Sequence, residues 1–336
     1  MSLKNHDYNR MKNSLNDEDI FLILKDMLTP STYKTYLSRL KMATEFTNRS
    51  IFAIMMYPQI SNMLISRRTD SFSYKKNIIT AILSTFKYLK EAKKIEYNDV
   101  QNEAWSIWQK FHANLAVLET EAYKNNEPTK KQQEKYVSFA DIRAKYTEMR
   151  EMSKGELHQD IPSSMRFLYL SIIANTPPKR CDYGQMKIYY DKDPNKTNEN
   201  YVVLHLKQNA NIPFTKDSYF VFNLYKTSDV YNRVDQPINE DLKNDIIDSL
   251  KWHNRQYLFV TRLNEPFANN KAFSKFVIRT FQTLFGVNSS STMLRHVYIS
   301  EVIDQNKWSD REKENLAKLM MHSSTLQNNY RWKSKN

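Results

Sequence analysis

The sequence contains very little glycine and cysteine and no long apolar run. Its three glycines, Gly155, Gly184 and Gly286, are scattered, whereas phosphate-binding loops and dinucleotide-binding turns need several glycines at fixed spacing. We therefore expect no nucleotide cofactor. Cys181 is the single cysteine, which excludes a disulfide framework and a zinc site built from several cysteines. Without a run of about 20 apolar residues or the apolar segment of a secretory signal, we expect an intracellular protein with no membrane span.

Positive charge and aromatic side chains are abundant. The 336 residues include 50 Lys and Arg against 37 Asp and Glu, a net charge of +13, and 13% are aromatic. So many aromatic residues favour a folded protein over a disordered basic tail. Lysine and arginine dispersed on a folded surface bind phosphates by displacing counterions. The composition is typical of a protein that binds a polyanion such as a nucleic acid, although a merely basic protein would share it.

We expect a flexible tail over residues 1–15 and a helical domain over 16–125. Apolar residues recur there at intervals of three and four, which predicts helices over 20–28, 31–46, 73–94 and 103–119. Pro30 is expected to end the first helix and Ser31 to cap the second. A polar segment broken by Pro128, residues 126–135, predicts a linker.

A second domain is expected over 136–336. The apolar segment 164–176 predicts a buried helix that stops before Pro177. Short runs of β-branched and aromatic residues predict strands over 185–190, 201–207, 218–225 and 232–239. Further helices are predicted from their N-caps, Ser138, Asn239 and Ser309, the last forming a capping box with Glu312. The predicted fold class is mainly α with a small β-sheet.

Four segments of this second domain carry residues suited to phosphate chemistry. Arg180 follows the buried helix in TPPKRCDYGQMKI, and Lys226 lies in FNLYKTSDVYN at the expected tip of a hairpin. Arg295 lies in the first turns of a helix, in STMLRHVYIS. His322 ends a helix in LMMHSSTLQNNYRW, with Tyr330 eight residues later. In this order, the four segments resemble the tyrosine recombinase (integrase) family, most closely its virus- and virophage-encoded branch.

The resemblance implies an architecture and an activity. A helical, SAM-like core-binding domain would precede a mixed α/β catalytic domain. The protein would be a site-specific recombinase that integrates a viral or mobile genome, acting on double-stranded DNA as a tetrameric synapse of two duplexes. The reaction needs no cofactor and no metal. A virus-encoded member would act in the host nucleus or in a cytoplasmic viral factory.

The resemblance also implies a role for each residue. Tyr330 would attack a DNA phosphate to form a 3′-phosphotyrosine, and Lys226 would protonate the departing 5′-oxygen. Arg180 and Arg295 would clamp the non-bridging oxygens, because guanidiniums stay charged and bind such oxygens through two hydrogen bonds. His322 would donate a hydrogen bond to one of these oxygens. A phenol with a pKa of about 10 needs this positive field to react.

Two positions depart from the family pattern. Thr292 stands where the family has a histidine, and threonine does not titrate near neutral pH, so the base is either absent, giving a slow enzyme, or supplied by His322. The step from His322 to Tyr330 is eight residues, where nine is commoner. Asp182 is a candidate orienting partner of Arg180, and His296 is expected to orient or pack.

Some alternatives stay open at this point. Lys207 or Lys216 replaces Lys226 as the general acid if the hairpin has another register. A type IB topoisomerase uses the same chemistry but acts alone. A DNA-binding protein that has lost catalysis is the alternative that Thr292 suggests.

Overall fold

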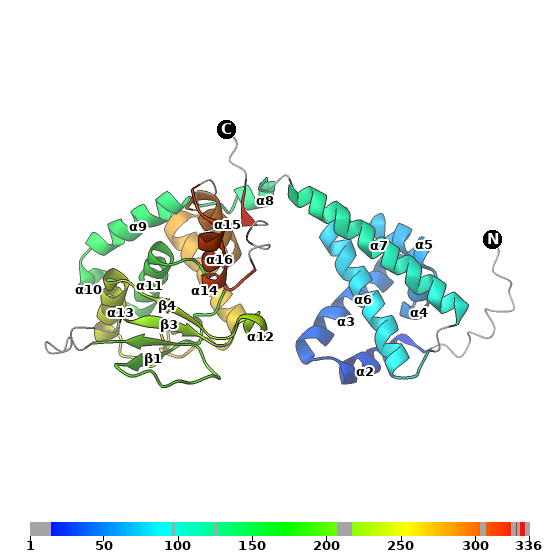
Figure 1. Cartoon of the computed structure of the whole chain (residues 1–336), viewed down its shortest axis with the longest axis horizontal. Coiled ribbons are helices and arrows are strands. Elements are labelled where there is room, and N and C mark those ends of the chain that lie inside the picture. The colour runs from blue at the N-terminus through cyan, green and yellow to red at the C-terminus, as the bar shows by residue number, and fades with distance from the viewer. Residues whose placement is uncertain are drawn as a thin grey trace. The chain divides into compact units, whose positions relative to one another are not determined.

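The computed structural model describes residues 15–95, 98–124, 127–206, 217–302, 307–323, 327 and 330–332. The chain divides into two units, Met1–Asn125 and Asn126–Asn336. The first is helical, and the second combines helices with a four-stranded sheet (Figure 1). The predicted fold class, mainly α with a small sheet, is confirmed. The expected flexible tail, 1–15, lies outside the described residues except for Leu15.

The first unit is built from amphipathic helices around an aliphatic core. Its helices are α2 (Asp17–Met27), α3 (Pro30–Thr47), α4 (Ile51–Met56), α5 (Pro58–Ser66), α6 (Phe72–Glu91) and α7 (Asp99–Lys124). The two longest, α6 and α7, pack against each other. Trp108 of α7 is fully buried, and its indole N–H donates to the Met55 carbonyl at 3.0 Å. This tryptophan is therefore a core residue.

The predicted N-cap of α3 is wrong. Thr29, and not Ser31, accepts the capping hydrogen bond, which comes from the N–H of Thr32, and Pro30 is the first helical residue. Proline is favoured at this position because its missing N–H would have no partner in the first turn and its φ already suits a helix. Pro30 thus begins α3, while α2 ends before it.

The second unit contains the longer helices α9 (Phe139–Glu151), α11 (Ile161–Asn175), α13 (Glu240–Trp252), α14 (Asn270–Phe285), α15 (Ser291–Glu301) and α16 (Asp310–Leu319). Short helices also occur: α8 (Lys130–Gln133), inside the predicted linker, α10 (Lys154–Leu157) and α12 (Ser228–Tyr231). The predicted caps Ser138, Asn239 and Ser309 all accept a backbone N–H, and Ser309 forms the expected capping box with Glu312. In the part of the chain that the structure describes, no helix is both long enough and apolar enough to cross a bilayer.

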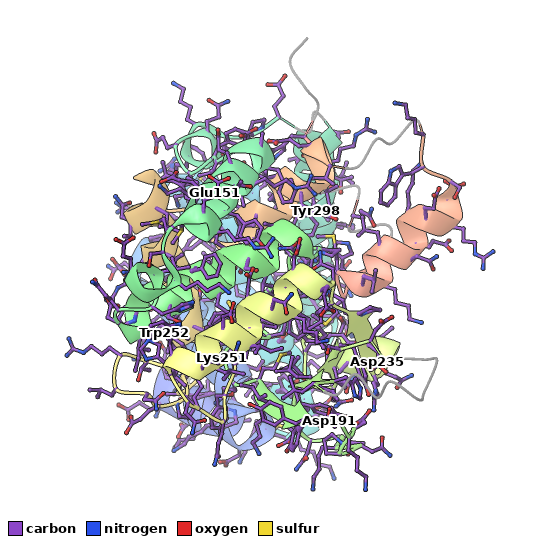
Figure 2. The ribbon with its side chains drawn as sticks, turned by 90° about the vertical axis from the view of Figure 1, so that its left-hand side faces the viewer. Glu151, Asp191, Asp235, Lys251, Trp252 and Tyr298 are labelled. Carbon is purple, nitrogen blue, oxygen red and sulfur yellow. The ribbon has the colours of Figure 1, made fainter. Side chains whose placement is uncertain are left out.

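The sheet has the order β1-β2-β3-β4. Its strands are β1 (Lys187–Tyr190), β2 (Tyr201–Leu204), β3 (Tyr219–Phe222) and β4 (Val234–Pro237). The pair β1–β2 is parallel, and the pairs β2–β3 and β3–β4 are antiparallel. One face contributes Val202, Leu204, Phe220 and Phe222 to the main core. In Figure 2, Asp191 and Asp235 mark the sheet, with α13 in front of the core.

Helix α11 supports the segment that carries Arg180. Ten of its residues are buried, so it is a core helix as predicted, and it ends at Asn175 ahead of two prolines. The chain then turns through Gly184, where a Cβ atom would lie 2.7 Å from Cβ of Phe273 in α14. Only glycine therefore allows α14 to approach this closely. The contact fixes the turn after Arg180 against the core.

Candidate active site

The C-terminal end of α16 accepts hydrogen bonds from three other elements. The consecutive carbonyl oxygens of residues 319–321 accept from Lys179 Nζ, from Arg295 Nη1 at 2.8 Å, and from Thr227 Oγ1 at 3.2 Å, in that order. The last carbonyls of a helix lack partners within the helix, and the helix dipole favours cations there. Two cations and a hydroxyl therefore fix the position of the next residue, His322.

Arg295 and His322 form a buried pair. Arg295 is 0% exposed and His322 1%, and the Nη2 of Arg295 donates to the Nδ1 of His322. A guanidinium can only donate, so the imidazole is neutral and carries its proton on Nε2. Burial and, to a smaller extent, the nearby positive charge of Arg295 lower the pKa of His322 to about 3.

Within the described structure, two donors of this pair are buried and unpaired. Among the described residues, neither Arg295 Nε nor His322 Nε2 has a hydrogen-bond partner. An unpaired buried donor is costly, and a bound anion would satisfy both. Burial also lowers the pKa of Arg295, to about 10, so its guanidinium stays charged at neutral pH.

The Tyr330 ring packs against this pair. Its centroid lies 5.0 Å from Cζ of Arg295 and 5.4 Å from the His322 ring, which is nearly parallel to it. On α15, His296 donates from Nδ1 to the Tyr330 carbonyl oxygen at 2.8 Å and stacks on the Trp332 ring at 4.9 Å. These contacts hold both the ring and the backbone of Tyr330. His296 therefore contacts both the backbone of Tyr330 and the Trp332 ring.

Arg180 and Asp182 both interact electrostatically with Arg295. The positive charge of Arg180 lowers the pKa values of both Arg295 and His322. Asp182 is buried, which raises the pKa of its carboxyl, and the charges of Arg180 and Arg295 oppose that rise. Within the described ranges, the Arg180 guanidinium has no ion pair or hydrogen bond, and the side chain is half-buried. It is thus available to a ligand.

Lys179 is a residue of this site that the sequence did not reveal. It is fully buried, and besides its bond to the end of α16 it lies 5.2 Å from the Phe222 ring centroid. Burial lowers the pKa of Lys179 to about 7. Its sequence position, between Pro178 and Arg180, gives no sign of burial, because burial here depends on β3 and α16.

Two predicted residues do not join the cluster. Lys226 is exposed and lies in the connection between β3 and β4, which contains α12, and not at the tip of a tight hairpin. Lys207 and Lys216, the alternative candidates, fall in the sequence between β2 and β3 and lie outside the described residues. Thr292 is exposed one turn before Arg295, and its side chain makes no hydrogen bond within the described ranges. The arrangement otherwise brings together Arg180, Asp182, Arg295, His296, His322 and Tyr330.

The cluster is suited to anions. In the described part of the chain, no group of three or more His, Cys, Asp or Glu side chains could hold a metal ion. Two arginines, Lys179 and the Nε2–H of His322 all supply donors, and Asp182 is the one carboxylate that this cluster includes. Once the buried Arg295 guanidinium is uncovered, these donors could hold an anion such as a phosphate beside the Tyr330 phenol.

Acid should destabilise the second unit through its buried histidines. Burial lowers the pKa of His158 to about 4 and that of His322 to about 3, both from 6.5. Below pH 6.5 the unfolded chain therefore binds protons that the folded chain does not, so stability falls as the pH falls. The expected loss is about 1.4 kcal/mol per pH unit for each histidine.

His158→Asn tests this expectation away from the phosphate cluster. His158 bonds the Ser164 hydroxyl at 2.8 Å and stacks on Trp252 at the end of α13 (Figure 2). Asparagine can keep the hydrogen bond but does not titrate. Urea unfolding at several pH values between 6.5 and 5 should show a shallower loss of stability in the variant. Equal slopes in the two proteins would contradict the buried, neutral state of His158.

Comparisons with known proteins find similar solved structures but no similar sequence. No family model matches the sequence, and no curated protein matches it. Among solved structures, the chain is similar to that described as "Crystal structure of XerA recombinase", with 11% sequence identity and a TM-score of 0.38. The match covers 95% of this chain and 94% of that one.

Proposed function

We propose that this protein breaks and rejoins DNA through a 3′-phosphotyrosine intermediate, as a site-specific recombinase. The observation that supports this most is the packing of the Tyr330 ring on Arg295 and His322, with unpaired buried donors beside it. The net charge of +13 suits a DNA substrate. The sequence resemblance to tyrosine recombinases supports the same roles for the same residues.

In the proposed reaction, the phenolic oxygen of Tyr330 attacks the phosphorus. The O–P bond to tyrosine forms, the bond to the 5′-oxygen breaks, the phenol loses its proton, and the 5′-oxygen gains one. Negative charge grows on the non-bridging oxygens, where Arg180 and Arg295 stabilise it. The Nε2–H of His322 adds a neutral donor. Rejoining by a 5′-hydroxyl reverses these steps and needs no external energy.

Access to the site requires a movement. Arg295 has no exposed surface, so a DNA phosphate reaches its guanidinium only after a covering side chain shifts. The Tyr330 ring is one of these covering groups. We infer that DNA binding displaces this ring from the guanidinium, which places the phenolic oxygen and the phosphate next to each other.

The finer parts of the proposal rest on the sequence resemblance. They are integration of a viral or mobile genome, a tetrameric synapse on two duplexes, and action in a host nucleus or viral factory. A type IB topoisomerase is the second candidate, because its chemistry is the same. Relaxation of supercoiled plasmid without resolution of a four-way junction would favour the topoisomerase; the reverse result would favour the recombinase.

Covalent capture tests the central proposal. A pool of nicked duplexes with randomised sequence lets the short fragment after a cleaved bond diffuse away, so a phosphotyrosine adduct accumulates. The native protein should give an adduct that survives boiling in detergent and is lost on protease treatment. The absence of any such adduct would reject the enzyme and leave the DNA-binding protein without catalysis, the alternative that Thr292 raises.

The general acid can be identified by a change of leaving group. Lys226 precedes Thr227, which is bonded to the end of α16, so we expect Lys226→Ala to slow cleavage by about 100-fold or more. On a substrate whose 5′-bridging oxygen is replaced by sulfur, the Lys226→Ala variant should cleave at the native rate, because a thiolate leaves without a proton. Lys207→Ala and Lys216→Ala serve as matched variants. Rescue confined to either of these would move the role from Lys226 to that lysine.

A further inference from the structure

A cavity of about 450 Å³ lies in the second unit, between the start of α11, the segment 260–267 and α14. Its apolar lining is made by Met165, Val260, Phe267, Ala272 and Phe276. The lining residues of α11 belong to its first turns, whereas Arg180 follows the other end of this helix. The cavity is therefore separate from the phosphate cluster, and the proposed reaction does not use it. Its volume lies in the range of small-ligand sites, about 300–1,000 Å³.

Four cations and no acidic side chain are found among the described residues that line this cavity. The cations are Arg166, Arg262, Lys275 and Arg279. Within the described ranges none of the four forms an ion pair, and the one hydrogen bond among them runs from Arg166 to the Ser163 hydroxyl at 3.0 Å. Elsewhere in the same unit, basic residues such as Lys154, Lys187 and Arg233 are paired with carboxylates. The unpaired charge around the cavity favours an anionic occupant.

Thr280 adds a polar atom that has no partner in the described structure. It lines the cavity, it is 1% exposed, and its hydroxyl makes no hydrogen bond among the described residues. A helical threonine ordinarily bonds the carbonyl four residues earlier. Six other threonines among the described residues do so: Thr35, Thr47, Thr80, Thr85, Thr120 and Thr176. The hydroxyl of Thr280 is thus left for a ligand.

We propose that this cavity binds a small amphipathic anion, a carboxylate or phosphate ester that carries an aliphatic or aromatic body. The apolar body would occupy the surface between Phe267 and Phe276, and the charged group would lie among the four cations, within reach of the Thr280 hydroxyl. Duplex DNA is a poorer occupant, because its convex surface reaches the cations but cannot fill an apolar hollow. The proposal is independent of the recombinase activity.

The fluorescent sulfonate 1-anilinonaphthalene-8-sulfonate is a direct probe, since it combines an aromatic body with one negative charge. The double variant Lys275→Ala with Arg279→Ala should weaken its affinity about tenfold or more. Both side chains are exposed, so the fold should be retained. Ala272→Phe should fill the cavity and abolish binding without any loss of charge. Lys271→Ala is the matched control, because Lys271 is exposed on α14 but does not line the cavity.

Competition defines the class of ligand. Decanoate should displace the probe at far lower concentration than inorganic phosphate, because phosphate has no apolar body. Equal probe affinity in the native protein, the double variant and Ala272→Phe would overturn the proposal, as would equal competition by decanoate and phosphate. Unchanged probe binding together with a large loss of duplex affinity in the double variant would also overturn it and assign these cations to DNA.

Discussion

Tyr330→Phe should abolish the covalent DNA adduct while duplex affinity stays within about twofold. The substitution removes one oxygen atom and keeps the ring that packs at 5.0 Å from Arg295 and 5.4 Å from His322. The bond from His296 reaches the backbone carbonyl of Tyr330 and survives as well. Loss of a nucleophile lowers turnover to background, a fall of more than about 1,000-fold. Capture on the nicked duplex pool measures the adduct, and a gel-shift titration measures the affinity.

Tyr298→Phe is the matched control. Tyr298 lies on α15 (Figure 2), as Arg295 does. It packs edge-on against Phe139 at 5.3 Å. This variant should form the adduct at the native rate. An adduct that persists in Tyr330→Phe would assign the nucleophile to another of the 21 tyrosines. Peptide mapping of that adduct would then name the residue.

Local signals in the sequence predicted where helices occur better than they predicted which elements contact each other in the fold. The capping box of Ser309 and Glu312 depends on residues three apart, so it can be recognised without knowing the fold. The parallel pairing of β1 with β2 joins strands that follow each other in the chain, where a hairpin would be the simpler expectation. The assignment of Lys226 to a hairpin tip failed for the same reason. It depended on which strands pair and on α12, and neither has a local signature.

The candidate site also combines residues that the sequence reveals with residues whose role depends on tertiary contacts. The sequence pointed to Arg180, Arg295, His322 and Tyr330 through a resemblance, and the structure gathers the last three within ring contact. The support for His322 was not visible, because backbone carbonyls of residues 319–321 carry no side-chain signature. Lys179 was missed because burying a lysine requires the end of α16 and the Phe222 ring, both distant in sequence.

Arg180→Ala should lower the rate of DNA cleavage by about 100- to 1,000-fold, the usual effect of removing one charged donor to a transition state. Because the Arg180 guanidinium has no ion pair or hydrogen bond within the described ranges, its removal breaks no such support of the fold. Most of the duplex affinity should remain, because the chain has 50 Lys and Arg in all and nonspecific affinity for DNA is spread over many cations. Single-turnover cleavage at saturating protein separates the chemical step from binding. Arg180→Lys should recover little, because an ammonium keeps the charge but cannot bind two oxygens in a plane.

Arg143→Ala controls for the loss of one positive charge. Arg143 is exposed on α9, and its guanidinium lies over the Phe139 ring at 4.9 Å, so it belongs to the same unit but not to the cluster. Its removal should leave the cleavage rate of bound DNA unchanged. If Arg180→Ala instead reduced affinity to background while bound DNA was cleaved at the native rate, Arg180 would be a DNA-binding residue. The phosphate clamp would then have to be built from Arg295 with another cation. The buried Lys179 is a candidate, because it donates to the Leu319 carbonyl, next to the Met320 carbonyl that Arg295 binds.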